Sequence, residues 1–248
     1  MQVDVMRKLA DSQVEAFDTE YVDDRRWDAV RVRIDQDFPR GEFRFLDVGG
    51  GNGAFSDRLL AHYPRAIGTV LDNSELLLSR NERNARKTCI CDSVKHVGHI
   101  GEKYDLISVN WLLHHLVGDS YVKTRQNQLA TLKSLRALLT TCGRVSIFEN
   151  MYNGWLIENL PGQIIYHLTS AKAIAAIARR MGANTAGVGV CFLSKSEWLS
   201  TIREAGLAVV SYVEPDNWVW RMPPMWRILL NIRERRVGHF WLTAPEGW

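Results

Sequence analysis

The sequence lacks any apolar run that approaches the ~20 residues needed for a membrane-spanning helix. Its first eight residues carry charge and have no apolar centre of the kind found in signal peptides. We therefore expect a cytoplasmic protein with no stable membrane insertion. The net charge is only +3, which is too small to indicate a nucleic-acid partner.

Cysteine is scarce, and common catalytic motifs are missing. The spacings of the four cysteines match no zinc pattern, so we expect reduced thiols. His96 and His99 lie three residues apart without accompanying cysteines or a run of carboxylates, and we expect no metal there. The sequence has no G-x-S-x-G, no phosphate-binding P-loop and no H-E-x-x-H. The four cysteines are Cys89, Cys91, Cys142 and Cys191.

What the sequence does have is the composition of an ordinary globular protein, with 46% apolar and 24% charged residues. Its 248 residues suffice for one domain with an elaborate cap. We expect a single domain over residues 1–248. Within it we distinguish an N-terminal helical segment (1–42), a helical cap insertion (150–193) and an insertion before the last strand (214–236).

Predicted strands and helices alternate along the chain. This order predicts an α/β fold with a Rossmann-like, seven-stranded, mostly parallel sheet. Ligands of such sheets bind at the carboxyl ends of the strands. Ser194 and Glu197 form a capping box, which predicts a helix that ends at Gly206. The predicted strands are 43–48, 66–71, 88–91, 104–109, 144–149, 207–213 and 237–242, and the other helices are 54–63, 73–86, 121–139 and 163–181.

A glycine-rich turn joins the first predicted strand to its helix. Gly49, Gly51 and Ala54 fit the dinucleotide pattern G-x-G-x-x-A, which many glycine-rich turns satisfy. Asp47, with Gly49, Gly51 and Gly53, also fits the more demanding pattern acid-x-Gly-x-Gly-x-Gly. A carboxylate here would repel a pyrophosphate. It suits a cationic ligand without a phosphate.

The chain here resembles the class I S-adenosylmethionine-dependent methyltransferases, in the branch that includes quinone-biosynthesis and natural-product enzymes. The resemblance covers about 43–150, 194–213 and 237–243. It implies that Asp72 holds the ribose hydroxyls, that Asp92 and Ser93 lie near adenine, and that 110–116 lies beside the methyl group. The implied cofactor-binding residues are Asp47, Gly49, Gly50, Gly51, Asn52, Gly53, Asp72, Asn73, Asp92, Ser93, Asn110 and Trp111.

The expected reaction is methyl transfer from S-adenosylmethionine to the oxygen, nitrogen or carbon of a small aromatic or lipophilic metabolite. Much of the rate of such an in-line displacement can come from holding acceptor and methyl group in line. A hydroxyl acceptor must also lose its proton, and histidine is the natural base near neutral pH. His114 and His115 are the candidates, although either can be structural. Glu149 should point into the same crevice, or else pair with an arginine.

Five residues outside the predicted sheet are candidates for an acceptor pocket, because ligand sites are mostly apolar with a few polar groups. Packing against the core is the alternative for each of them. They are Tyr21, Tyr152, Trp155, Tyr166 and His167.

The insertion at 214–236 departs from the family pattern, since a short hairpin is usual there. It is rich in tryptophan and arginine. The sequence leaves three interpretations open. These are a helix packed on the sheet edge, a basic surface for a membrane interface or an anionic apolar acceptor, and a contact in a homodimer.

Two other functions are compatible with the fold. A nicotinamide oxidoreductase would use Gly49, Gly51 and Ala54 as its dinucleotide turn, but Asp47 and the lack of a Tyr-x-x-x-Lys motif argue against it. A non-catalytic relative would keep the fold as a binding module.

Overall fold

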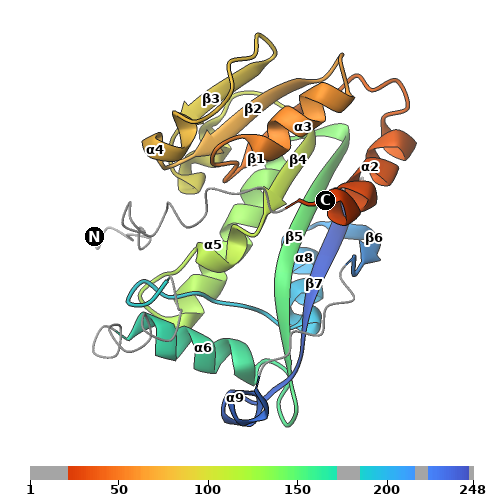
Figure 1. The fold of residues 1–248 in the computed structure, drawn as a ribbon. Helices are drawn as coiled ribbons and strands as arrows, with labels where there is room; N and C mark the ends of the chain where they lie inside the picture. Colours follow the sequence, from red (N-terminus) through yellow and green to blue (C-terminus); the bar gives the residue numbers. More distant parts are fainter. Residues whose placement is uncertain (1–21, 172–184, 216–222, 246–248) are drawn as a thin grey trace.

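A seven-stranded sheet forms the centre of the molecule in this computed structural model, which describes residues 22–171, 185–215 and 223–245 (Figure 1). The strand order is β3-β2-β1-β4-β5-β7-β6. The first five are parallel, and β7 runs antiparallel to both β5 and β6. The expected Rossmann-like, mostly parallel sheet is therefore confirmed. The strands are β1 Arg44–Val48, β2 Ile67–Asp72, β3 Lys87–Cys91, β4 Tyr104–Asn110, β5 Leu139–Gly154, β6 Ala208–Val213 and β7 Ile232–Thr243.

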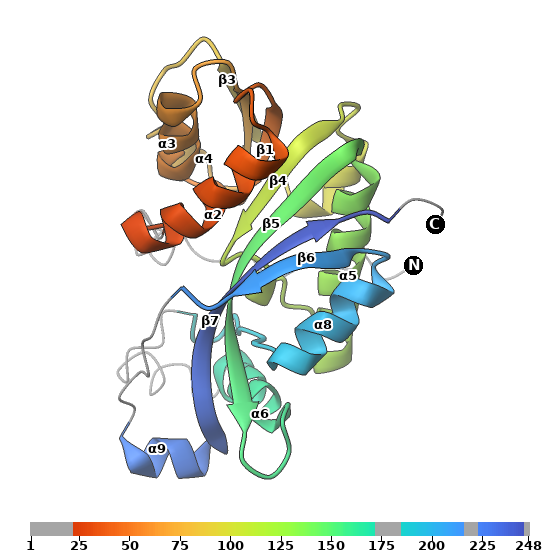
Figure 2. The ribbon, with the colours of Figure 1, turned by 90° about the vertical axis from the view of Figure 1, so that its right-hand side faces the viewer.

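Helices cover both faces of the sheet, with α2 and α3 on one side and α5 and α8 on the other (Figure 2). The side chains of β1 alternate between these layers: Phe45 packs with α2 and α3, whereas Leu46 packs in the cluster that contains α5 and α8. Burial on both faces explains why the parallel strands are apolar. The helices are α2 Asp24–Asp37, α3 Ala54–His62, α4 Glu75–Leu78, α5 Tyr121–Ala137, α6 Leu160–Ser170, α8 Lys195–Glu204 and α9 Pro224–Leu229, with short 3-10 turns η2 Val94–His99 and η3 Leu113–His115.

The predicted helix at 73–86 was too long, since α4 contains only Glu75–Leu78. Ser74 caps this helix by accepting a hydrogen bond from the backbone of Leu77. Beyond the helix, Asn81 donates to the backbone carbonyls of Gly51 and Leu78. Asparagine side chains compete with helical backbone hydrogen bonds in this way, so the chain leaves the helix early.

The last part of the sheet is longer than predicted. The expected strands 144–149 and 237–242 extend to 139–154 and 232–243. β5 and β7 stay paired as far as Gly154 and Ile232. Residues 150–154 and 232–236, which we expected in the two insertions, thus form a two-stranded extension of the sheet, called the arm below.

The elements around the arm also differ from expectation. Helix α6 begins at Leu160 and ends at Ser170, whereas a helix over 163–181 was predicted; residues 172–181 lie outside the described parts of the chain. Helix α9 contacts β7 but buries none of its residues. No helix within the described ranges is long and apolar enough to cross a bilayer.

Candidate active site

The glycine-rich turn follows β1 at the carboxyl edge of the sheet and leads directly into α3. Gly49, Gly51 and Gly53 have φ angles of 72°, 53° and 77°, a left-handed conformation that favours glycine. A Cβ on Gly53 would lie 1.9 Å from Oδ1 of Asn81. Both the positive φ and this close approach therefore exclude larger residues at position 53. Asn52 accepts a hydrogen bond from the backbone of Ala54 and completes the turn.

Asp47 lies beneath this turn and is only 1% exposed. Its two carboxylate oxygens accept hydrogen bonds from the hydroxyls of Ser56, at 2.8 Å, and Ser108, at 2.9 Å. Burial raises the pKa of Asp47 to about 6, against the lowering effect of the two serines. A Cβ on Gly50 would lie 2.7 Å from this carboxylate. Asp47 thus supports the turn from below, and its contact with a cofactor stays a prediction.

Asp72 ties the turn to the end of β2. One carboxylate oxygen accepts from the backbone N–H of Gly51 at 3.0 Å, and the other accepts from Ser74 at 2.8 Å. The carbonyl of the same Gly51 accepts from Asn81 at 2.8 Å. The turn is therefore held on both sides at its central glycine.

The predicted cofactor residues form a row along neighbouring strands, because Asp72, Asp92 and Asn110 end or follow β2, β3 and β4. Asp92 is exposed, accepts from the backbone of Ser93 and pairs with Nδ1 of His96 at 2.7 Å; the hydrogen bond from His96 lowers the pKa of Asp92. The side-chain oxygen of Asn110 is buried and has no hydrogen-bond partner among the described residues. Asn73, beside Asp72, is exposed.

The chain turns sharply after β4. Trp111 has a φ of 52°, which is rare for a residue other than glycine. Its ring stacks on Phe148 of β5 with centroids 5.2 Å apart, and the guanidinium of Arg26 lies 4.9 Å from the ring centroid. These contacts hold the loop that carries the two candidate histidines.

His114 and Glu149 form a buried pair in this loop. Nδ1 of His114 lies 2.7 Å from Oε2 of Glu149, and the backbone N–H of His114 donates to Oε1 at 3.3 Å. Glu149 is fully buried. Within the described ranges the charged partner of Glu149 is therefore His114, and no arginine pairs with it. His115 packs on His114 with ring centroids 4.1 Å apart, and burial lowers the pKa of His115 well below 6.5.

Backbone hydrogen bonds fix the loop around His114. Gln128 of α5 donates to the carbonyls of Leu113 and Cys191, and the carbonyl of His114 accepts from the backbone of Cys191 at 2.9 Å. Tyr166 of α6 donates to the carbonyl of Gly118 at 3.1 Å. Tyr166 therefore braces this loop, and its contact with an acceptor stays a prediction.

The other predicted acceptor residues separate. Tyr152 is buried, and its ring lies 4.7 Å from that of Phe192, which in turn lies 4.7 Å from His114. Trp155 and His167 are exposed and away from this group, and Tyr21 lies outside the described residues. Sequence reasoning missed Phe192, because it lies in an irregular segment with no periodicity. It also missed Ser56 and Ser108, because single serines within a helix and a strand carry no signal.

Comparisons with known proteins agree with this geometry. Residues 46–145 match the sequence model of a family described as a methyltransferase domain. No curated protein matches the sequence. An S-adenosylmethionine-dependent methyltransferase of Leishmania major has a similar structure, with a TM-score of 0.62 and 16% identity over 94% of this chain and 82% of that one.

Two further solved structures share the fold. The magnesium protoporphyrin IX methyltransferase of Synechocystis PCC 6803 has a TM-score of 0.54 and 13% identity, over 88% of this chain and 81% of its own. An O-methyltransferase from neocarzinostatin biosynthesis has a TM-score of 0.54 and 16% identity, over 88% of this chain but only 57% of its own length. The cofactor inferred from the sequence, S-adenosylmethionine, agrees with these matches. Residues 46–145 thus match a methyltransferase domain in sequence, and the chain shares the fold of solved S-adenosylmethionine-dependent methyltransferases.

Proposed function

We propose that this protein methylates a hydroxyl group of a small aromatic or lipophilic metabolite, with His114 as the base. The observation that carries the proposal is the 2.7 Å contact between Nδ1 of His114 and the buried carboxylate of Glu149. His114 follows the end of β4 and meets Glu149 within β5, beside the row of predicted cofactor residues. An oxygen acceptor is favoured over carbon or nitrogen because a histidine paired with a carboxylate is suited to removing a hydroxyl proton.

Glu149 is the positioning residue in this proposal. An ionised carboxylate only accepts hydrogen bonds, so it fixes His114 in the tautomer with its proton on Nδ1. Nε2 is then free to accept a proton from the acceptor. The carboxylate also stabilises the imidazolium that forms, the role that an aspartate has in Ser-His-Asp triads.

His115 is less suited to act as the base. Burial and the neighbouring His114 lower its pKa well below 6.5, which weakens it as a proton acceptor at neutral pH. It is therefore the packing partner in our proposal, and the choice between the two histidines falls on His114.

The residues at the carboxyl edge fit the cofactor. Asn110 offers a buried oxygen that lacks a partner among the described residues, and the turn from Gly49 to Gly53 allows close approach to the backbone. Asp72 has acceptor capacity beyond its two backbone hydrogen bonds. We propose that these groups and Asp92 hold S-adenosylmethionine, which supplies an activated methyl group when bound.

An aromatic or lipophilic acceptor is supported by the surroundings of His114. Phe192 contacts its ring, and Tyr152 continues the aromatic row into a cluster with Ile165, Val190 and Ile232. The structurally similar O-methyltransferase from neocarzinostatin biosynthesis was solved with 1,4-dihydroxy-2-naphthoic acid. We therefore expect hydroxylated aromatic acids to be a useful first panel of acceptors.

Two measurements test the proposal. Calorimetry should show binding of S-adenosylmethionine and none of NAD, which would be the ligand of an oxidoreductase. Transfer of an isotopically labelled methyl group to the aromatic panel and to a cell extract, followed by mass spectrometry, should then identify a methylated hydroxyl.

Variants of the pair separate a base from a structural histidine. His114→Ala should lower kcat by roughly 10²–10⁴-fold, the usual contribution of general-base catalysis, with S-adenosylmethionine affinity unchanged. Glu149→Gln should lower kcat and shift the acidic limb of the kcat–pH profile, while His167→Ala, an exposed histidine of α6, serves as the control. Unchanged kcat in folded His114→Ala would refute the base assignment.

A further inference from the structure

The exposed apolar side chains of this protein gather at one place, the end of the arm. Of twelve large hydrophobic residues exposed among the described residues, six lie there. Leu156 is 89% exposed and Ile228 is 78% exposed. We call this surface the tip; its six residues are Trp155, Leu156, Ile157, Met225, Ile228 and Leu229.

The two segments of the tip are joined through Asn231. Its carbonyl accepts from the backbone of Trp155 at 3.2 Å, and its side chain accepts from Leu156 at 3.3 Å and donates to Ile157 at 3.2 Å. The indole of Trp155 donates to the carbonyl of Ile232 at 2.8 Å. The loop and α9 are therefore one unit, with backbone polar groups paired internally and apolar side chains facing outward.

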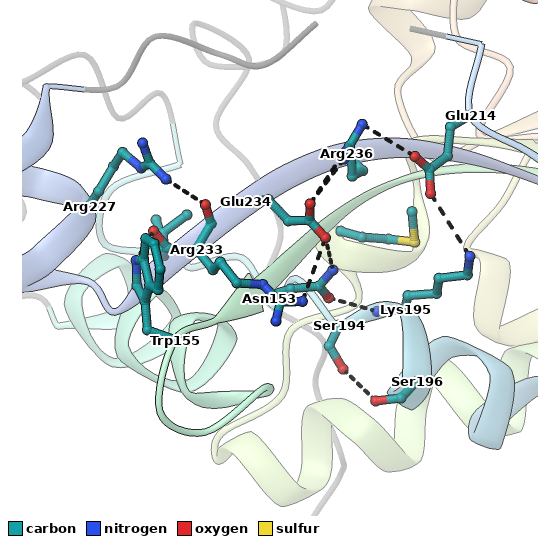
Figure 3. A network of polar contacts seen from close by, with 12 residues as sticks. Asn153, Trp155, Ser194, Lys195, Ser196, Glu214, Arg227, Arg233, Glu234 and Arg236 are labelled. Carbon is teal, nitrogen blue, oxygen red and sulfur yellow. Dashed lines mark hydrogen bonds and ion pairs between the residues drawn. The ribbon is translucent and has the colours of Figure 1, made fainter. Parts of the chain in front are cut away.

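Polar contacts anchor the base of the arm to the rest of the molecule (Figure 3). Asn153 donates to Glu234 across the two strands at 2.9 Å and accepts from the backbone of Lys195 at 3.2 Å. Arg236 pairs with Glu234 at 3.1 Å and with Glu214 at 3.5 Å, and Glu214 lies 3.9 Å from Lys195. The arm thus presents the tip in a fixed orientation beyond the sheet.

Arginines lie beside the tip and along the arm. The stretches 150–160 and 224–236 contain four arginines and two glutamates, and Arg236 is paired with Glu234 at the base of the arm. Arg227 donates to the carbonyl of Arg233 at 2.6 Å, and its guanidinium lies 5.8 Å from the ring centroid of Trp155. Arg233 is exposed. Tryptophan beside arginine, with apolar side chains further out, is typical of surfaces that lie in the headgroup region of a membrane.

We propose that the tip docks on an anionic lipid surface. Two features favour lipid over a protein partner. The tip is the projecting end of the arm (Figures 1 and 2), and its clustered apolar side chains, which are 56–89% exposed, suit insertion among acyl chains. The excess of arginine is complementary to anionic headgroups. With only six residues, α9 lies at the interface and does not span the membrane.

Docking would bring the candidate active site close to the lipid. Ile232 of the arm and Tyr152 pack in one cluster, and Phe192, packed against it, contacts His114. This apolar row leads from the arm to the proposed base. The consequence that a membrane-dissolved acceptor reaches the site in this way rests on the proposed function, whereas docking itself does not.

Vesicle co-sedimentation of the full chain tests the docking. We expect the protein to sediment with vesicles of phosphatidylcholine and phosphatidylglycerol, more weakly with phosphatidylcholine alone, and less as sodium chloride rises. Ile157→Asp and Leu156→Asp should each weaken binding by about tenfold or more, since each removes a large buried aliphatic group from the lipid contact.

Ile67→Asp is the matched control. Ile67 is 51% exposed against 56% for Ile157, and it begins β2 at the opposite end of the sheet, so its variant should bind vesicles like the unmodified protein. Absence of binding to anionic vesicles, or equal binding by Ile157→Asp, overturns the proposal. Sedimentation equilibrium tests a second way in which the proposal can fail. If the unmodified protein is a dimer, does not bind vesicles and becomes a monomer in Ile157→Asp, the tip is a contact between two copies.

Methyl transfer to a water-soluble acceptor should be unchanged in Ile157→Asp, because the side chain is remote from His114. Loss of vesicle binding with retained transfer would support docking and leave the proposed function intact. Vesicle binding without any transfer would instead support docking and contradict the proposed function.

Discussion

The buried carboxylate of Asp47 leads to a prediction about stability. Burial raises its pKa from 3.8 to about 6. The hydrogen bonds from Ser56 and Ser108 and the positive charge of Lys87 lower this pKa but do not outweigh burial. A raised carboxyl pKa means that the folded state binds a proton which the unfolded state releases at lower pH. Ionisation of Asp47 therefore destabilises the fold as pH rises from about 4 to 6 and beyond.

The size of the effect follows from the two pKa values. A shift from 3.8 to about 6 corresponds to about 3 kcal/mol once both states are ionised. Integrating between about pH 4 and pH 8 gives ~2.5 kcal/mol, most of it below about pH 6. Asp47→Asn removes this ionisation, so the variant should gain about that much stability relative to the unmodified protein across this range.

The site can accept asparagine. Its amide oxygen can accept from Ser56 at the position of Oδ2, and its NH₂ can donate to the hydroxyl oxygen of Ser108. The Ser108 hydroxyl then turns to the carbonyl of Leu46, which is 3.5 Å away. Urea unfolding at several pH values gives the free energy of unfolding for both proteins. Asp119→Asn, at an exposed carboxylate, is the control.

The measured quantity must be the difference between the two proteins, because His239 acts in the opposite direction. Burial lowers the pKa of His239 to about 3, so the folded state resists its protonation and stability falls as pH drops below about 6.5. This trend is common to both proteins and cancels in the difference. Parallel stability curves for Asp47→Asn and the unmodified protein would refute the reasoning.

Two further predictions concern the turn and the fold. Asp72→Ala should lower the affinity for S-adenosylmethionine by roughly 10–100-fold, the value of one or two hydrogen bonds to a charged group; calorimetry checks this, and unchanged affinity would contradict the role of Asp72. Ser194→Ala should cost about 1 kcal/mol in urea unfolding, because it removes the capping box that Ser194 forms with Glu197; Ser196→Ala, within the same helix, should cost less.

The sequence predicted the parts of the fold that local signals determine. Apolar runs located all seven strands, the glycines located the turn after β1, and Ser194 with Glu197 located the start of α8. The longer strands of the arm were missed because their partners are distant in sequence. In the arm, polar residues such as Asn153 and Glu234 pair across the two strands, and an apolar sequence pattern cannot predict such pairing.

The roles of the two histidines also depend on residues that are distant in sequence. Two adjacent histidines are equivalent in a pattern, and only the register of β4 and β5 distinguishes them. Asn110 pairs with Phe148, which places Glu149 beside the loop that follows β4. The 3-10 turn after β4 then brings both Nδ1 and the backbone N–H of His114 to that carboxylate. His115 is left with a lowered pKa.

The unusual backbone at Trp111 connects this site to the N-terminal segment. A φ of 52° at a tryptophan is strained and persists only where surrounding contacts enforce it. Phe148 of β5 stacks on the Trp111 ring, and Arg26 of α2 contacts the same ring. Because Trp111 begins the loop that carries His114, α2 contributes to the geometry of the proposed base as well as to the core. In our proposal α2 therefore helps to position the loop that carries His114, although its sequence carries no catalytic motif.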